Sequence, residues 1–158
     1  MIFSNKNILL CVTVGIAAYK SPEIIRLFMK DGADVKVIMT ESAKEFITPL
    51  TLQAVSGNEI HDSLLDIEAE RAMGHIELAK WADLILIAPC TAETLSKLTH
   101  GRADDLMGAV ILASNTSVYI APAMNMNMWS NKGTQENFES LSSSCLLYTS
   151  PSPRDTPQ

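Results

Sequence analysis

Residues Asp83–Pro89, with the sequence DLILIAP, form the clearest buried strand in the chain. Their apolar residues are consecutive and do not alternate with polar ones, which is typical of a strand buried on both faces. Asn7–Val14, NILLCVTV, has the same character. Because strands of this kind occur in parallel sheets covered by helices on both sides, the two runs predict such a sheet.

Helix signals separate the predicted strands. Ser21 as N-cap, Pro22 at the first helical position and Glu23 in the first turn predict a helix that ends near Gly32. The alternation of strands and helices predicts a single α/β domain with a Rossmann-like or flavodoxin-like parallel sheet and helices on both faces. The remaining strands are expected at Asp34–Thr40 and Ser117–Ala121, and further helices at 41–56 (with a break at Pro49), 75–81, 93–99, 104–112 and 132–141.

Composition excludes several classes of protein. The 158 residues are enough for one domain, and the formal net charge of -6 without a basic stripe argues against nucleic acid as the main partner. No apolar run is long enough to cross a bilayer. The three cysteines, Cys11, Cys90 and Cys145, lack the spacing of a disulfide framework or zinc site, so we expect no metal and a reducing, cytoplasmic location.

The last residues, 145–158, depart from this pattern. Their sequence, CLLYTSPSPRDTPQ, is dominated by Pro, Ser and Thr. It is interpreted either as a disordered tail or as the in-frame translation of a sequencing adapter. In both cases we expect the folded domain to cover residues 1–144, and in the second case the natural protein to continue beyond Ser144.

Hydroxyl side chains follow three of the predicted strands. Thr13 follows the first strand, Thr40 and Ser42 the second, and Thr91 and Thr94 the third. Ligands of parallel α/β sheets bind beyond the carboxyl ends of the strands, and helix N-termini there favour a phosphate. The alternative for each hydroxyl is a simple helix N-cap.

The first turn, TVGIAAYK, narrows the class of ligand. It carries one glycine, Gly15, and matches neither GxGxxG nor GxxxxGK[ST]. Dinucleotides and P-loop nucleotides are therefore disfavoured, and a mononucleotide such as FMN fits better.

Two further segments have open interpretations. His75 stands at a predicted helix start, where it is either a solvated or capped helix end or an acid–base group. Residues 122–129, PAMNMNMW, are either a Met-rich core patch or dimer surface, or a segment in which the Asn125 amide binds a substrate carboxylate or amide. Asp104 and Asp105 are adjacent, so one of them is expected to cap a helix.

Seven motifs, taken together, resemble the FMN-containing cysteine decarboxylases, and most of all the N-terminal domain of bacterial bifunctional phosphopantothenoylcysteine decarboxylase/phosphopantothenate–cysteine ligases. The resemblance covers about residues 5–141. The motifs are GIAAYK (15–20), MTESAKEFITP (39–49), LQAVSG (52–57), GHIELAKWAD (74–83), APCTAETL (88–95), GRADDL (101–106) and PAMNMNMW (122–129).

The resemblance implies a reaction and an assembly. FMN oxidises the thiol of 4'-phosphopantothenoylcysteine, the thioaldehyde loses CO2, and reduction gives 4'-phosphopantetheine for coenzyme A synthesis. The family forms trimers or dodecamers with the flavin at a subunit interface, and a ligase domain is often fused to it. The alternatives are a non-catalytic FMN-binding subunit, a peptidyl-cysteine decarboxylase and a flavodoxin-like electron carrier. His75 and Asn125 argue against the carrier.

The resemblance also assigns residues. His75 matches the catalytic histidine, as a base or orienting group, and Asn125 matches the asparagine that holds the substrate. Positions matching flavin contacts are Gly15, Ile16, Thr40, Ser42, Thr91, Ala92, Thr94 and Ala123.

Three departures from the family pattern stand out. Val14 replaces a usual Gly or Ser in the phosphate turn, and Glu93 replaces an Asn or Asp, which affects a hydrogen bond to the flavin ring. The family's substrate-covering flap, with its proton-donating cysteine, is expected downstream of these 158 residues, and Cys145 is not given that role. We therefore expect the 158-residue chain to bind FMN at best and to react incompletely.

Overall fold

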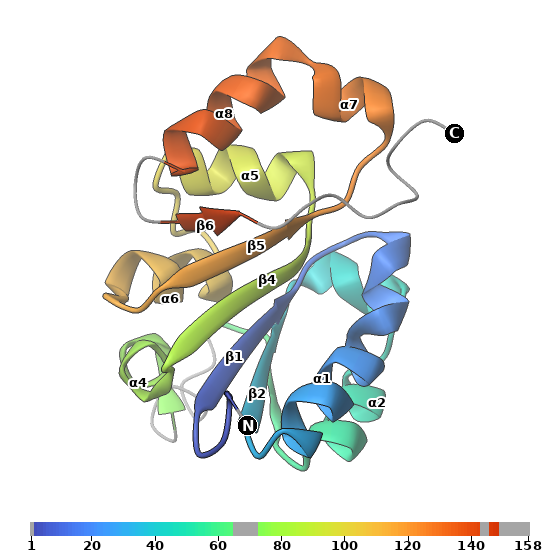
Figure 1. The fold of residues 1–158 in the computed structure, drawn as a ribbon, viewed down its shortest axis with the longest axis vertical. Helices are drawn as coiled ribbons and strands as arrows, with labels where there is room; N and C mark the ends of the chain where they lie inside the picture. The colour runs from blue at the N-terminus through green and yellow to red at the C-terminus, as the bar shows by residue number, and fades with distance from the viewer. Residues whose placement is uncertain (1, 65–72, 143–145, 149–158) are drawn as a thin grey trace.

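The computed structural model describes residues 2–64, 73–142 and 146–148. Within these ranges, six strands form one sheet in the order β3-β2-β1-β4-β5-β6 (Figure 1). Every neighbouring pair is parallel, which confirms the predicted sheet. The strands are β1 (Asn7–Val12), β2 (Asp34–Met39), β3 (Ile60–His61), β4 (Leu84–Cys90), β5 (Val118–Pro122) and β6 (Leu146–Tyr148).

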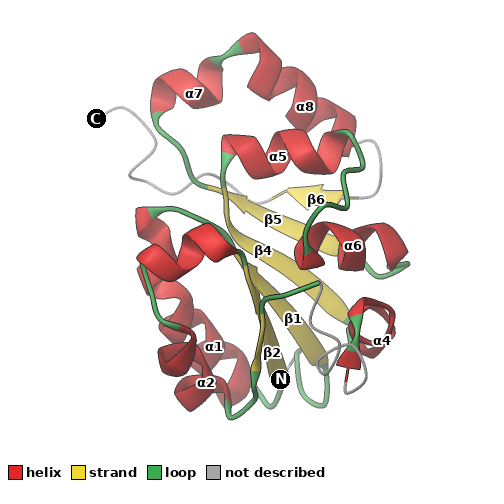
Figure 2. Cartoon of the chain, turned by 180° about the vertical axis from the view of Figure 1, so that it is seen from behind, coloured by secondary structure: helices red, strands yellow, loops and turns green. Residues whose placement is uncertain are grey.

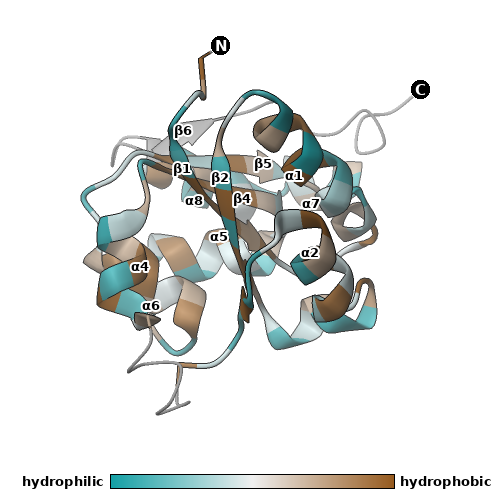
Figure 3. Ribbon diagram, turned by 90° about the horizontal axis from the view of Figure 1, so that it is seen from below, coloured by the Kyte–Doolittle hydropathy of each residue, from teal (hydrophilic) through white to brown (hydrophobic). Residues whose placement is uncertain are grey.

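Helices cover both faces of the sheet, as predicted (Figure 2). Seen from below, α1 and α2 lie on one side of the strands and α4 and α6 on the other (Figure 3). The helices are α1 (Ser21–Lys30), α2 (Pro49–Ser56), α4 (His75–Trp81), α5 (Ala92–Thr99), α6 (Leu106–Ala113), α7 (Met126–Ser130) and α8 (Lys132–Ser142), with short 3-10 helices η1 (Ile16–Lys20) and η2 (Glu41–Glu45).

The central strand β1 joins two hydrophobic cores. Ile8 and Leu10 pack in the core beneath α1 and α2, whereas Leu9 and Cys11 pack in the core beneath α4, α5 and α6. Alternate residues of a strand point to opposite faces, so a continuous apolar run fills both cores. Complete burial of side chains of this size contributes about 1.5–3 kcal/mol each.

Several predicted boundaries need correction. Ser21 is not an N-cap, because η1 runs directly into α1 and the Ser21 Oγ donates a hydrogen bond to the Ala18 carbonyl (2.6 Å). The helix predicted from Asp104 begins at Leu106, and Asp105 is its cap, as expected for one of the two aspartates. The short elements η1, α7 and β3 were not predicted.

The C-terminal segment is described in part. Leu146–Tyr148 pair with β5 as strand β6, so a disordered tail does not describe these three residues. The other residues of 145–158 lie outside the described ranges. The domain end at residue 144 and the adapter origin of the segment stay predictions.

The sheet has a topological switch point between β1 and β4. From β1 the chain builds outward to β2 and β3 on one side, and then crosses to β4 and β5 on the other. Loops leaving neighbouring strands in opposite directions open a crevice at the carboxyl ends, where ligands of such sheets bind. None of the helices in the described part of the chain is long and apolar enough to cross a membrane.

Candidate functional site

A cavity of about 260 Å³ lies at this switch point. Residues that follow β1, β2 and β4 supply one part of its wall, and α5 and the start of α6 supply the rest. We call it the switch-point cavity. Its lining residues are Thr13, Val14, Thr40, Glu41, Ser42, Thr91, Glu93, Thr94, Lys97, Asp105 and Met107.

Thr40 is the residue that most clearly points to a ligand. It follows β2 with an extended backbone and occupies the N-cap position of η2, but its side chain makes no capping hydrogen bond. Its Oγ1 is buried and has no hydrogen-bond partner. A buried hydroxyl without a partner costs about 1–3 kcal/mol, and such groups are rare in native proteins. A polar ligand in the cavity would remove this cost.

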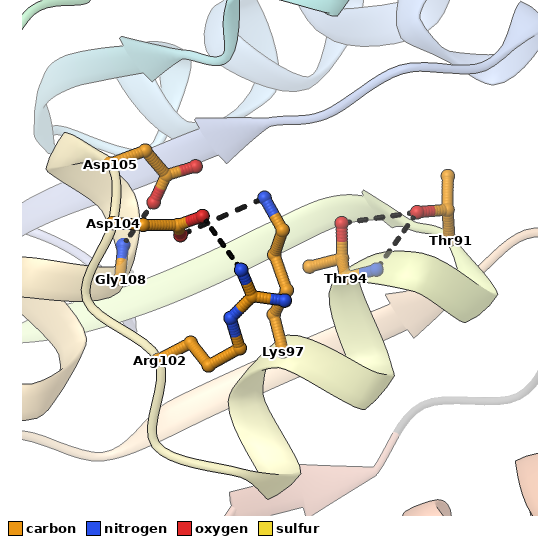
Figure 4. Close-up of polar contacts among 7 residues, drawn as sticks. All are labelled: Thr91, Thr94, Lys97, Arg102, Asp104, Asp105 and Gly108. Carbon is orange, nitrogen blue, oxygen red and sulfur yellow. Dashed lines mark hydrogen bonds and ion pairs between the residues drawn. The ribbon is translucent and has the colours of Figure 1, made fainter.

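The hydroxyls at the start of α5 have partners within the chain. The Thr91 Oγ1 accepts a hydrogen bond from the Thr94 backbone N–H (3.2 Å) and donates one to the Thr94 Oγ1 (3.0 Å) (Figure 4). Thr91 is thus an N-cap, the alternative that the sequence left open. The Thr13 Oγ1 donates to the Pro89 carbonyl and ties β1 to β4.

A salt bridge anchors the β2 side of the switch-point cavity. Lys44 of η2 pairs with Glu41 (2.9 Å) and with Asp62 (2.7 Å), just after β3. Hydrogen bonds to Asp62 and Glu41 raise the pKa of Lys44. This contact joins η2 to the end of β3 and places one cation between two carboxylates, of which Glu41 lines the cavity.

The positively charged side chain of the cavity, Lys97, lies on its α5–α6 side. Lys97 lies 3.8 Å from Asp104, which also pairs with Arg102 (3.2 Å) (Figure 4). Asp105 accepts a hydrogen bond from the Gly108 N–H (2.8 Å) and so caps α6. Of the described residues that line the cavity, only Lys97 carries a positive charge.

Two cysteines lie in the sheet close to this edge. Burial raises the pKa of the Cys90 thiol to about 12. Burial, and secondarily the charge of Asp105, raises the pKa of Cys11 still further. Both side chains are therefore neutral, packed thiols near pH 7 and are unsuited to nucleophilic chemistry. Cys145 lies outside the described residues.

Four of the eight predicted cofactor positions line the cavity: Thr40, Ser42, Thr91 and Thr94. The other four, Gly15, Ile16, Ala92 and Ala123, do not line it. Ile16 is two-thirds exposed, Ala92 is the first residue of α5, and the Ala123 N–H donates to the Cys90 carbonyl (3.0 Å). Gly15 has φ 146°, a conformation that side chains rarely adopt.

His75 does not line the switch-point cavity of its own chain. It is the first residue of α4, after Gly74, whose carbonyl accepts the first helical hydrogen bond, from the Leu78 N–H (2.9 Å). The His75 Nδ1 atom is buried. In Figure 1, α4 lies beside the beginning of β4, away from η1 at the opposite end of the strands. A role of His75 at the cavity therefore requires another copy of the chain.

Asn125 likewise does not line the cavity. Its Oδ1 accepts a hydrogen bond from the Met128 N–H (2.9 Å), so it caps α7. Met126 and Met128 are 40% and 45% exposed, whereas Met124 is buried. A Met-rich core patch is therefore wrong for Met126 and Met128, and a surface that receives a partner or ligand agrees better with their exposure.

Sequence reasoning missed four lining residues: Glu41, Lys97, Asp105 and Met107. A signal for Lys97 existed, because Thr91, Thr94 and Lys97 recur every three residues and share one face of α5. No signal marked Met107, which reaches the cavity because the 100–105 loop brings the start of α6 there. In the described ranges, no three His, Cys, Asp or Glu side chains cluster where they could share a metal ion.

The sequence profile of the flavoprotein family matches residues 3–155. The chain belongs to the flavoprotein family. This confirms the family resemblance. The coenzyme A biosynthesis bifunctional protein CoaBC of Vibrio cholerae is 55% identical to this flavoprotein over 138 residues, which are 87% of this chain and 35% of the relative. The flavoprotein thus spans about a third of the length of this relative.

Solved structures with the same fold include decarboxylases. The FMN-dependent cysteine decarboxylase SpaF superimposes with a TM-score of 0.85 at 28% identity, covering 92% of this chain and 84% of SpaF. A variant PPC decarboxylase complexed with pantothenoylaminoethenethiol gives a TM-score of 0.77 at 28% identity, with 92% and 81% of the two chains covered.

Proposed function

We propose that this flavoprotein binds FMN and catalyses the decarboxylation of 4'-phosphopantothenoylcysteine to 4'-phosphopantetheine in coenzyme A biosynthesis. The observation that carries the proposal is the buried, unpartnered Thr40 Oγ1 in the switch-point cavity. The similarity to CoaBC and to a PPC decarboxylase supports the substrate.

The residues of the cavity fit a flavin mononucleotide. Thr40 offers a hydroxyl without a partner, Ser42 an exposed hydroxyl, and the start of α5 offers backbone N–H groups and the positive end of a helix dipole. When bound, FMN would supply the two-electron oxidation of the substrate thiol and the later reduction of the decarboxylated product. The residues of the chain then bind, orient and shield the reacting groups.

We infer that the active site is completed by a neighbouring subunit. The cavity of about 260 Å³ is smaller than the ~300–1,000 Å³ of typical ligand pockets, so one chain encloses only part of a mononucleotide. His75 and Asn125 do not line the cavity of their own chain. The proposed assembly is a homotrimer, or a dodecamer built from trimers, in which a second copy brings these two residues to the flavin.

In this assembly the two residues have distinct roles. The imidazole of His75 accepts or orients the proton of the substrate thiol, because imidazole exchanges protons near neutral pH. The Nδ2 group of Asn125 donates to an oxygen of the substrate carboxylate or amide, while its Oδ1 keeps capping α7. We also propose a cytoplasmic location and a fused ligase domain in the intact protein, as in the bifunctional relatives.

The second candidate is the decarboxylation of C-terminal cysteine residues of peptides. The similarity to the peptidyl-cysteine decarboxylase EpiD, with a TM-score of 0.82, favours it, but the identity of 25% is well below the 55% with CoaBC. The third candidate function is that of a subunit that binds FMN but catalyses no decarboxylation.

The test joins residues 1–141 to the remainder of the Vibrio cholerae relative, with that relative as the positive control. Incubation with 4'-phosphopantothenoylcysteine should release CO2 and 4'-phosphopantetheine, and a peptide ending in cysteine should not react. His75→Asn should keep the yellow flavin and lose turnover. A yellow chimera that reacts only with the peptide, or with neither substrate, would contradict the proposed reaction.

A further inference from the structure

Lys97 has a position that the proposed function does not yet use. It lies on α5 three residues after Thr94, on the helix face that lines the switch-point cavity. Long side chains on a helix point back toward its N-terminus, which here is the cavity end. The side chain is 27% exposed, so its amino group is partly shielded from solvent.

The ion pair that Lys97 makes within the chain is replaceable. Its amino group is 3.8 Å from the Asp104 carboxylate, beyond normal hydrogen-bond length, whereas Arg102 donates a hydrogen bond to the same carboxylate at 3.2 Å (Figure 4). Arg102 therefore keeps Asp104 paired if Lys97 turns toward the cavity.

Three carboxylates line the cavity and would repel an anionic ligand, so binding of such a ligand needs a nearby positive charge. Glu41 shares Lys44 with Asp62, and its side chain is 77% exposed, so solvent screens its charge. Asp105 is engaged as the cap of α6. Glu93 is exposed to solvent, which screens its charge. Lys97 is thus the charge available, among the described lining residues, to neutralise an anion next to the N-terminus of α5.

We propose that Lys97 binds the phosphate of the mononucleotide and makes the site select FMN over riboflavin. This inference rests on the proposed function, because it requires FMN to occupy the switch-point cavity. A charge-assisted hydrogen bond from the amino group would join the helix dipole of α5 and the Thr40 hydroxyl in holding the phosphate.

The experiment titrates the flavin-free chain with FMN and, separately, with riboflavin, which lacks the phosphate. In Lys97→Met, FMN affinity should fall by about tenfold to a hundredfold, and riboflavin affinity should change by less than about twofold. Lys97→Arg should restore most of the FMN affinity. The matched control is Lys132→Met, because Lys132 is 91% exposed on α8 and should affect neither titration.

Three outcomes would overturn the assignment. An equal loss of both flavins in Lys97→Met would mean that the residue acts on the ring or on the fold, and thermal unfolding of the flavin-free variants would separate these two. Unchanged FMN affinity in Lys97→Met would show that Lys97 does not bind the phosphate. A wild-type chain that binds riboflavin as tightly as FMN would show that the site does not recognise the phosphate. Binding of neither flavin by the wild-type chain would instead refute the proposed function, and the assignment with it.

Discussion

Two cavities in the described part of the chain, both next to α5 and α6, invite a comparison. The switch-point cavity measures about 260 Å³. A second cavity, of about 390 Å³, lies between α5, α6 and α8, and Leu98, Gly108, Asn115 and Leu141 are among its lining residues. We call it the α6–α8 cavity. By volume alone, the α6–α8 cavity would be the better candidate of these two for a binding site.

The polar groups reverse that ranking. In the α6–α8 cavity, the Thr99 Oγ1 donates to the Leu95 carbonyl (2.8 Å) and the Thr116 Oγ1 to the Ala82 carbonyl (3.0 Å). In the switch-point cavity, the Thr40 Oγ1 is buried without a partner. A cavity whose polar groups already have partners has little to offer a polar ligand, so unmet hydrogen-bonding capacity identifies the site better than volume does.

The largest expected effect comes from filling each cavity in turn. Ser42→Trp places an indole at an exposed position that lines the switch-point cavity and should lower FMN affinity more than about a hundredfold. Asn115→Trp does the same at an exposed position of the α6–α8 cavity and should leave FMN affinity unchanged. Calorimetric titration measures both. A loss in Asn115→Trp alone would assign the ligand to the other cavity.

A second substitution tests the wall between the two cavities. A Cβ at Gly108 would lie 2.4 Å from the Arg102 carbonyl oxygen, so Gly108→Ala must displace the loop that leads to Asp105. The free energy of unfolding should fall by about 1–3 kcal/mol, and FMN affinity should fall as well. Gly133→Ala, on α8, is the control and should be close to neutral, because its Cβ would meet only the Asn131 side-chain oxygen, at 3.2 Å, which can shift. A Gly108→Ala variant with wild-type stability, measured by urea denaturation, would show that the loop yields freely.

A third pair separates binding from stability. Thr40→Val removes the unpartnered hydroxyl, so FMN affinity should fall about tenfold while the flavin-free protein is as stable as before or slightly more stable. Thr116→Val removes a hydrogen bond to Ala82 and should lower stability by about 1 kcal/mol without changing FMN affinity. The opposite pattern in titration and thermal unfolding would invert the roles assigned to the two cavities.

The smallest effect concerns His61, which lines neither cavity. Burial, and secondarily the charge of Lys36, lowers the pKa of His61 in the folded state. Below an unfolded pKa of about 6.5 the unfolded chain binds the proton more readily, so stability should fall as pH drops from 6.5 through the folded pKa. In urea denaturation between about pH 7.5 and 5.5, His61→Gln should flatten this dependence. An unchanged slope would exclude His61 as its source.

The long elements could be predicted from the sequence because local signals agree with the fold. The helix expected at 75–81 has the observed bounds of α4, and the strand expected at Asp83–Pro89 differs from β4 by one residue at each end. The five-residue α7 was missed because the alternation of Met and Asn in its sequence hides a single turn, which depends on the Asn125 cap. Such short elements are stabilised by caps and packing more than by periodicity.

The site could be predicted only in part. The hydroxyls after β2 and β4 line one cavity, because topology brings the ends of parallel strands together, and their contact with a flavin stays a prediction. Lys97 was missed because a lysine inside a helix is usually solvated, and only the tertiary path of the 100–105 loop makes it line a cavity. Whether a hydroxyl such as that of Thr91 caps a helix or is left without a partner, like that of Thr40, depends on side-chain geometry that the sequence does not contain.

The most direct test of the switch-point site is a crystal structure of the chain grown with FMN. The account predicts that FMN occupies the switch-point cavity, with one of its oxygens within hydrogen-bond distance of the Thr40 Oγ1. FMN bound between α6 and α8, beside Asn115, or density for the flavin with Thr40 still unpartnered, would contradict it.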